Sequence, residues 1–158
     1  MTDILDFNDL PARIDDEDAL EELLSRPSQA LIDDLSQHEG DIMILGVGGK
    51  IGPTLARLAK RAAPAKRIIG VARFSDASVK HRLESWGIET IACDLLERDQ
   101  VNALPETPNV IYMAGKKFGT EIDSSFAWAM NTFVPGLVAE KFRASRIVVF
   151  STLCVYPF

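Results

Sequence analysis

Short apolar runs alternate along the chain with segments in which apolar residues recur at helical spacing. The apolar runs are rich in isoleucine and valine and fall at residues 42–45, 67–72, 88–92, 110–113 and 147–150. The helical segments between them cover residues 54–63, 76–86, 99–104 and 124–142. Runs that are apolar throughout predict strands covered by helices on both faces. The alternation therefore predicts an α/β fold with a doubly wound parallel sheet of about five strands.

The first 40 residues follow a different pattern. A run of acidic residues precedes one helical face, which is formed by Ala19, Leu20, Leu23 and Leu24. Pro27 ends this helix, and Ser28 is placed to cap a second one. We expect two short amphipathic helices that pack on the main domain through their leucines; a dedicated partner-binding arm is the alternative. The chain is thus divided into a short acidic helical extension, residues 1–40, and one domain, residues 41–158.

The charge of the chain is divided unevenly between these two parts. The net charge is −6, but residues 1–40 hold 12 acidic and two basic side chains, net −10. Residues 41–158 hold 11 acidic and 15 basic side chains, net +4. The acidic extension argues against binding of nucleic acid. The mildly basic remainder suits an anionic small ligand.

Composition narrows the class of protein further. No run approaches the 18 or so apolar residues of a membrane span, so we expect no membrane insertion. The first residues lack the basic and apolar regions of a secretory signal. The two cysteines lie in apolar runs and form no disulfide framework, which favours the cytoplasm. With two histidines and no Cys/His cluster, we expect no metal site.

A glycine-rich loop at residues 46–52 directly follows the first strand and opens a helix. Its spacing is G-x-x-G-x-x-G, although Gly48 also permits a G-x-G-x-x-G reading. Gly46 allows the sharp turn, Gly49 lets a pyrophosphate approach the backbone, and Gly52 lets the helix pack on the strand. The free amides at the helix start would face the phosphates, which adds Lys50 and Ile51 to the expected binding residues.

The sequence of this loop bears on two other interpretations. A glycine-rich turn without a ligand is the alternative to a dinucleotide site, but the strand–helix context favours the site. A nucleoside-triphosphate P-loop is excluded, because Lys50 is followed by Ile51 instead of Ser or Thr and position 44 is Ile.

With further motifs, residues 41–158 resemble the extended short-chain dehydrogenase/reductase family, the NAD-dependent epimerase/dehydratases, whose fold is Rossmann-like. The motifs are Asp94-Leu95, the segment 113–117, Asn131 in the long helix, and Ser151-Thr152-x-x-Val155-Tyr156. The resemblance implies that Asp94, with Leu95, holds the adenine amino group. It places Ala114, Gly115 and Lys117 beside the ribose and nicotinamide, makes Asn131 the support of that loop, and makes Thr152 the catalytic hydroxyl.

Several of these residues have a plainer interpretation as well. Asp94 would also serve as the N-cap of the following helix. Lys117 would also be expected in solvent, and Thr152 as an ordinary hydrogen-bonded loop residue.

One departure from the family concerns the catalytic Tyr-x-x-x-Lys, which is expected beyond Thr152. The chain contains this spacing at Tyr112 and Lys116, but there it joins a strand end to a loop instead of one helical turn. We therefore expect the chain to be the cofactor-binding portion of an oxidoreductase that acts on a hydroxyl or carbonyl group. By analogy with the family, the substrate would be a nucleotide sugar. This chain alone resembles a fragment and would be inactive, with association into a homodimer. The alternative is a non-catalytic sensor or regulatory module that binds NAD(P).

The end of the second strand bears on the choice of cofactor. Members of the family that prefer NAD carry an acidic residue there, where this chain has Ala72. Arg73 follows, and with the Ser75 hydroxyl it would bind a 2′-phosphate. The residues therefore predict NADP in preference to NAD. Arg73 in solvent or stacked on the adenine is the alternative, and Asp76 is near enough in sequence to neutralise it.

Overall fold

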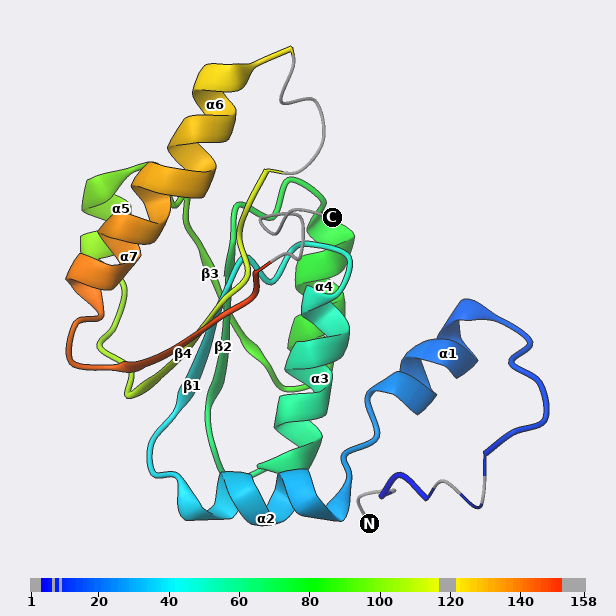
Figure 1. Cartoon of the computed structure of the whole chain (residues 1–158). Coiled ribbons are helices and arrows are strands. Elements are labelled where there is room, and N and C mark those ends of the chain that lie inside the picture. Colours follow the sequence, from blue (N-terminus) through cyan, green and yellow to red (C-terminus); the bar gives the residue numbers. More distant parts are fainter. Residues whose placement is uncertain (1–3, 7, 9, 117–121, 152–158) are drawn as a thin grey trace, which may run out of the picture.

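A computed structural model describes residues 4–6, 8, 10–116 and 122–151 of the chain. Five strands form one sheet in the order β3-β2-β1-β4-β5, and every neighbouring pair is parallel. The strands are β1 (Ile42–Leu45), β2 (Ile68–Ala72), β3 (Glu89–Ala92), β4 (Asn109–Tyr112) and β5 (Arg146–Val149). Figure 1 shows helices on both sides of this sheet. The doubly wound, Rossmann-like sheet expected from the sequence is confirmed.

Helices cover the sheet in two layers. One layer holds α3 (Gly52–Ala62) and α4 (Ala77–Ser85), and the other holds α5 (Arg98–Asn102) and α7 (Val134–Lys141). The helix α6 (Ser124–Trp128) lies on the same side as α7 but extends past the carboxyl ends of the strands (Figure 1). Alternate residues of β1 enter the two layers, because side chains of a strand point to opposite faces. Ile42 and Ile44 join the hydrophobic cluster under α3 and α4, whereas Met43 and Leu45 join the cluster under α5 and α7.

The outer strands differ from the expectation that both faces of every strand are buried. All four residues of β1 are buried, but no residue of β3 or β5 is fully buried. Val148 and Val149 on β5 are 53% and 58% exposed, and Phe150 beside them is also exposed. The expectation was wrong for these two strands. A position at the edge of the sheet, which the run of apolar residues does not reveal, leaves them only partly covered.

We expect the exposed side of β5 to make the chain associate. Unpaired strand edges and exposed apolar side chains favour pairing between copies. Light scattering on the purified chain should give a mass above the 17.4 kDa of one copy, rising with concentration. Val149→Lys should shift the mass toward one copy, because association would have to bury a charged lysine at this exposed position. A wild-type chain that stays monomeric at high concentration would contradict this expectation.

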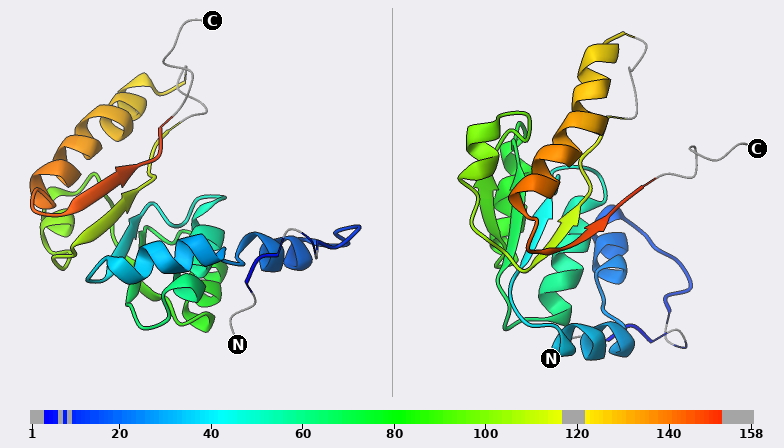
Figure 2. Two further views of the ribbon diagram at one scale, coloured as in Figure 1. Left: turned by 60° about the horizontal axis from the view of Figure 1, so that its bottom comes forward. Right: turned by 60° about the vertical axis from the view of Figure 1, so that its left-hand side comes forward.

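The N-terminal helices are α1 (Glu17–Leu24) and α2 (Gln29–Gln37), which lie on the α3 side of the sheet (Figure 2). The expected caps are present: Asp16 accepts a hydrogen bond from the Ala19 amide, and Ser28 accepts one from Leu31. The expected packing through leucines is wrong for α1, which buries no residue. Leu20 and Leu24 are 39% and 56% exposed.

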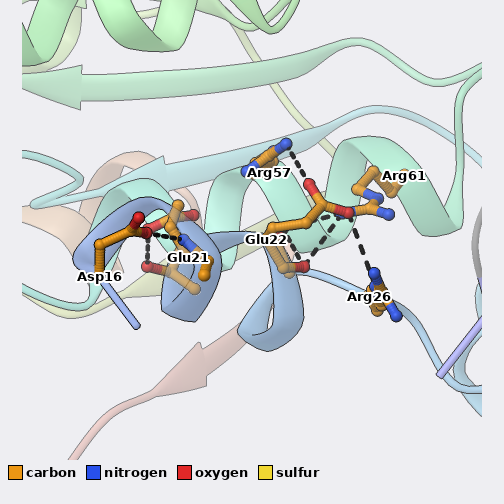
Figure 3. Close-up of polar contacts among 9 residues, drawn as sticks. Asp16, Glu21, Glu22, Arg26, Arg57 and Arg61 are labelled. Atoms are coloured by element: carbon orange, nitrogen blue, oxygen red, sulfur yellow. Dashed lines mark hydrogen bonds and ion pairs between the residues drawn. The ribbon is translucent and has the colours of Figure 1, made fainter. Parts of the chain in front are cut away.

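Polar contacts attach α1 to α3 instead (Figure 3). The Glu22 carboxylate pairs with Arg57 at 2.5 Å and with Arg61 at 2.9 Å, and Thr54 donates a hydrogen bond to Glu21 at 2.6 Å. Partial burial raises the pKa of Glu22, but the hydrogen bond from Arg61 and the charges of both arginines outweigh it, so that the pKa falls below its usual value. The outer face of α3 is basic, which is why acidic residues of α1 meet it.

The long helix expected at residues 124–142 is interrupted. A π-helical turn, η1 (Ala129–Phe133), separates α6 from α7 and contains Asn131. π-helical turns occur often at functional sites, because the extra residue changes the direction in which side chains point. The helical pattern of the sequence does not reveal this turn, since both helical forms place apolar residues at similar spacing.

Candidate functional site

A cleft of about 390 Å³ lies at the carboxyl ends of the strands. The segments that follow β1, β2, β3 and β4 contribute to it. The residues that line it are Gly46, Gly48, Gly49, Ala72, Arg73, Phe74, Ser75, Asp76, Val79, Cys93, Asp94, Leu95, Met113, Ala114, Gly115 and Met130. In open parallel sheets, ligands bind at this end, where the order of strands reverses on either side of the first strand.

The glycine loop contributes to the cleft, and the three glycines of its G-x-x-G-x-x-G spacing have different surroundings. Gly46 has φ +93°, and a Cβ atom there would lie 2.7 Å from the Ala114 amide nitrogen. Among the residues that the structure describes, a Cβ atom on Gly49 would meet only the Gly46 carbonyl oxygen, at 3.6 Å, so they leave that space open. A Cβ atom on Gly52 would lie 2.0 Å from the Val47 carbonyl oxygen. Gly46 and Gly52 are therefore needed for close packing of the backbone, whereas Gly49 leaves room for a ligand.

The start of α3 follows this loop and presents unused backbone donors. Among the described residues, the amides of Gly48, Lys50 and Ile51 donate no hydrogen bond to another backbone group or side chain. Together with the helix dipole, such amides form a favourable environment for an anion. The side chains of Lys50 and Ile51 are exposed and do not line the cleft, so any contact of these two residues with a phosphate would come from the backbone.

The loop after β2 forms one wall of the cleft. Arg73 is exposed, and its Nη1 atom lies 4.0 Å from a carboxylate oxygen of Asp94. Asp76 is occupied elsewhere, because it caps α4 by accepting a hydrogen bond from the Ser78 amide at 2.9 Å. Hydrogen bonds from Ser78 lower the pKa of Asp76. The expectation that Asp76 neutralises Arg73 is therefore corrected: the carboxylate nearest to Arg73 is that of Asp94.

The segment after β3 brings Asp94 and Leu95 to the cleft. The Asp94 carboxylate accepts a hydrogen bond from the Leu96 amide at 3.0 Å, and Leu95 is 6% exposed. Asp94 is not the N-cap of α5, because Glu97 occupies that position. The plainer interpretation of Asp94 is thus wrong, and its carboxylate faces the cleft within reach of Arg73. Its predicted contact with an adenine stays a prediction.

The loop after β4 contributes Ala114 and Gly115 to the cleft, and Asn131 holds this loop in place. The Asn131 side chain accepts a hydrogen bond from the Lys116 amide and donates one to the Lys116 carbonyl oxygen, both at 2.8 Å. Asn131 itself does not line the cleft. Lys117 and Thr152, the other residues predicted for this region, lie outside the described residues.

Sequence reasoning missed several residues that line the cleft: Phe74, Cys93, Met113 and Met130. Cys93 and Met113 directly follow β3 and β4, so their position at strand ends was an available signal. Cys93 is buried; burial and the charge of Asp94 raise the pKa of its thiol. Met130 belongs to the π-helical turn, which the sequence pattern did not predict.

Tyr112 and Lys116, which share the spacing of a catalytic pair, do not act together here. Tyr112 is 4% exposed at the end of β4, and its hydroxyl donates a hydrogen bond to the Met130 carbonyl oxygen at 3.4 Å. Burial raises the pKa of Tyr112 to about 12. The Lys116 ammonium instead lies 5.7 Å from the centre of the Phe126 ring. The sequence-based rejection of this pair agrees with its geometry.

The described part of the chain contains neither a cluster of metal ligands nor a membrane-spanning helix. Within residues 4–6, 8, 10–116 and 122–151, no three metal-ligating side chains gather at one point. Across the same residues, no helix has the length and apolar character needed to cross a membrane.

A family model described as the NAD dependent epimerase/dehydratase family matches residues 42–157. The match begins at β1 and leaves out the two N-terminal helices. It includes the glycine loop, the loops after β2, β3 and β4, and the predicted position of Thr152. No protein with a curated description matches the chain significantly.

Solved structures share the fold at low sequence identity. ADP-L-glycero-D-manno-heptose-6-epimerase from Helicobacter pylori matches 75% of this chain with a TM-score of 0.65 and 18% identity. L-threonine dehydrogenase from Clostridium difficile matches 71% with a TM-score of 0.57 and 15% identity. BdcA, solved in complex with NADPH, matches 72% with a TM-score of 0.56 and 16% identity. The matches span 40%, 36% and 52% of the lengths of those chains.

Proposed function

The chain belongs to the NAD dependent epimerase/dehydratase family, and we propose that residues 41–158 form the dinucleotide-binding part of an oxidoreductase. Residues 1–40 are proposed as a separate acidic extension attached through α1. The observation that carries the proposal is the cleft at the carboxyl ends of four strands, with an open glycine loop on one side and Arg73 and Asp94 on another. This end of the sheet is where the fold binds dinucleotides.

The residues present fit such a cofactor. The open space at Gly49 and the free amides at the start of α3 suit a pyrophosphate. Asp94 and Leu95 are proposed to hold the adenine, and Ala114 and Gly115 the ribose and nicotinamide. The nicotinamide supplies hydride transfer when it is bound. Asn131 would keep the loop at 114–116 in its binding conformation through its two hydrogen bonds to Lys116.

The proposed substrate is a small molecule with a hydroxyl or carbonyl group. Thr152 would orient that group, as the resemblance implies. By analogy with the family, the proposed substrate class is a nucleotide sugar. The name of the matched heptose epimerase indicates a substrate of this class for that protein. The 158 residues contain no Tyr-x-x-x-Lys other than Tyr112 and Lys116, whose tyrosine is buried. We therefore propose that this chain by itself binds the cofactor without turnover.

Calorimetric titration of the purified chain with NADPH and NADH tests the proposal. Saturable binding of at least one dinucleotide is expected, and the same preparation should oxidise or reduce candidate substrates far more slowly than the roughly 1 s⁻¹ of ordinary enzymes. Absence of binding to either dinucleotide would contradict the proposed function. Binding together with turnover at enzyme-like rates would contradict only the inactivity of this chain.

NADPH is the expected preference. Arg73 lines the cleft, and no acidic residue follows β2 directly, so nothing at Ala72 repels a 2′-phosphate. A hydrogen bond to a charged group contributes about 1.5–3 kcal/mol. Arg73→Ala should therefore lower NADPH affinity roughly tenfold to a hundredfold and leave NADH affinity nearly unchanged. The matched structure that holds NADPH agrees with this cofactor class.

Arg82 offers a matched control for this substitution. It lies on α4, where its guanidinium is 5.5 Å from the Trp86 ring, and it does not line the cleft. Arg82→Ala removes the same charge from the chain, so both titrations compare proteins of equal net charge. A wild type that prefers NADH, or an Arg73→Ala variant whose affinity ratio equals that of Arg82→Ala, would show that Arg73 is not the selector.

A further inference from the structure

The loop after β2 contains an unusual backbone conformation. Phe74 has φ +51°, and among the described residues it is the one non-glycine residue with a positive φ. Left-handed backbone is disfavoured for every residue with a side chain and is rare for a bulky one. Such a conformation persists only where surrounding structure holds it, and residues of this kind gather at binding sites.

Packing of the Phe74 side chain holds the loop in this conformation. The ring is partly buried against the hydrophobic cluster under α3 and α4, where Ala72, Val79 and Trp86 also pack. Burial of an aromatic side chain contributes a large apolar area, which offsets the cost of the backbone conformation. The ring therefore anchors the loop at its centre. Phe74 lines the cleft together with its two neighbours in sequence, Arg73 and Ser75, which are both exposed.

Other contacts do little to hold the Arg73 side chain. The guanidinium pairs with Asp94 at 4.0 Å, and the two side chains are 60% and 34% exposed. A long ion pair that is open to solvent stabilises a geometry only weakly. Asp76 is engaged at the start of α4. The placement of Arg73 thus depends mainly on the backbone of the loop.

We propose that Phe74 is a positioning residue for cofactor selection: its ring holds the loop in the left-handed conformation that presents Arg73 and Ser75 to the 2′-phosphate of NADPH. The inference rests on the proposed function and adds to it a residue that discriminates between the two cofactors without contacting the phosphate.

The ratio of NADPH to NADH affinity tests this role. Phe74→Ala should lower the ratio about tenfold, because Arg73 is no longer held toward the phosphate. Phe74→Tyr retains the ring and should keep the wild-type ratio. In the Arg73→Ala background, Phe74→Ala should cause no further change, since coupled residues give non-additive effects. A purely structural role of Phe74 would weaken the binding of both cofactors alike.

A second readout needs no cofactor. At an ordinary position alanine stabilises a protein relative to glycine, but at a positive φ the order reverses. Phe74→Gly should therefore melt about 2–4 °C above Phe74→Ala in thermal unfolding followed by circular dichroism. If Phe74→Ala fails to fold, Phe74→Gly decides the affinity ratio, because it removes the ring without the backbone strain.

The outcomes separate the inference from the function on which it rests. An unchanged affinity ratio in Phe74→Gly or Phe74→Ala overturns the positioning role, and so does an alanine variant that melts above the glycine variant. A wild type that binds both dinucleotides equally overturns the inference and leaves the proposed function standing. A wild type that binds neither overturns the proposed function itself.

Discussion

Gly49→Val is expected to weaken dinucleotide binding by at least about a hundredfold while the chain stays folded. Within the described part of the chain, a Cβ atom at this position meets only the Gly46 carbonyl oxygen, at an ordinary contact distance of 3.6 Å, so there is room for a side chain. The same room is the space in which a pyrophosphate would approach the free amides before α3. A branched side chain would fill it. Calorimetric titration with NADPH measures the loss, and circular dichroism verifies the fold.

Gly136 provides the matched control for this substitution. It lies on α7, and a Cβ atom there would have no neighbour within 4 Å among the described residues beyond its own stretch of helix. Gly136→Val therefore makes the same chemical change in open space away from the cleft. NADPH affinity should remain at the wild-type value in this variant. If Gly49→Val binds NADPH as well as Gly136→Val does, the pyrophosphate does not lie at the glycine loop.

Gly52→Ala is expected to unfold the chain or to destabilise it severely, although it adds a smaller side chain than Gly49→Val does. A Cβ atom at Gly52 would lie 2.0 Å from the Val47 carbonyl oxygen and 2.5 Å from its carbon, both rigid backbone atoms. Overpacking costs about 1–3 kcal/mol and sometimes more, and a clash with backbone lies at the upper end. Proteins have only about 5–15 kcal/mol of stability. Urea denaturation should show the loss.

Gly49→Ala belongs in the same measurement as a control. It introduces the same methyl group three residues earlier in the loop, where contact is ordinary, and its midpoint in urea should stay close to that of the wild type. A Gly52→Ala variant with the wild-type midpoint would mean that α3 can shift away from β1 at little cost. The two glycines of one motif would then have no separate roles.

The local pattern was sufficient for most of the fold. Every expected strand is present within one residue at each end, because a short run of apolar, β-branched residues favours a strand. The same run does not specify how far helices cover the strand, as β3 and β5 show. The caps at Asp16 and Ser28 were also predictable, since a cap depends on residues only three positions apart. The π-helical turn at 129–133 was not, because nothing in the periodicity distinguishes it.

The sequence by itself determined which segments form the sheet and where its glycine loop lies, because those features depend on neighbours along the chain. The tertiary structure alone decided that Arg73 meets Asp94 rather than Asp76. The pairing of β2 with β3 brings Asp94 alongside, while the cap of α4 engages Asp76. It also decided that α1 meets α3 through the ion pairs of Glu22, while Leu20 and Leu24 stay exposed. Contacts between distant segments depend on the register of neighbouring strands and on which face of a helix or sheet is already covered. A local sequence pattern specifies neither of these.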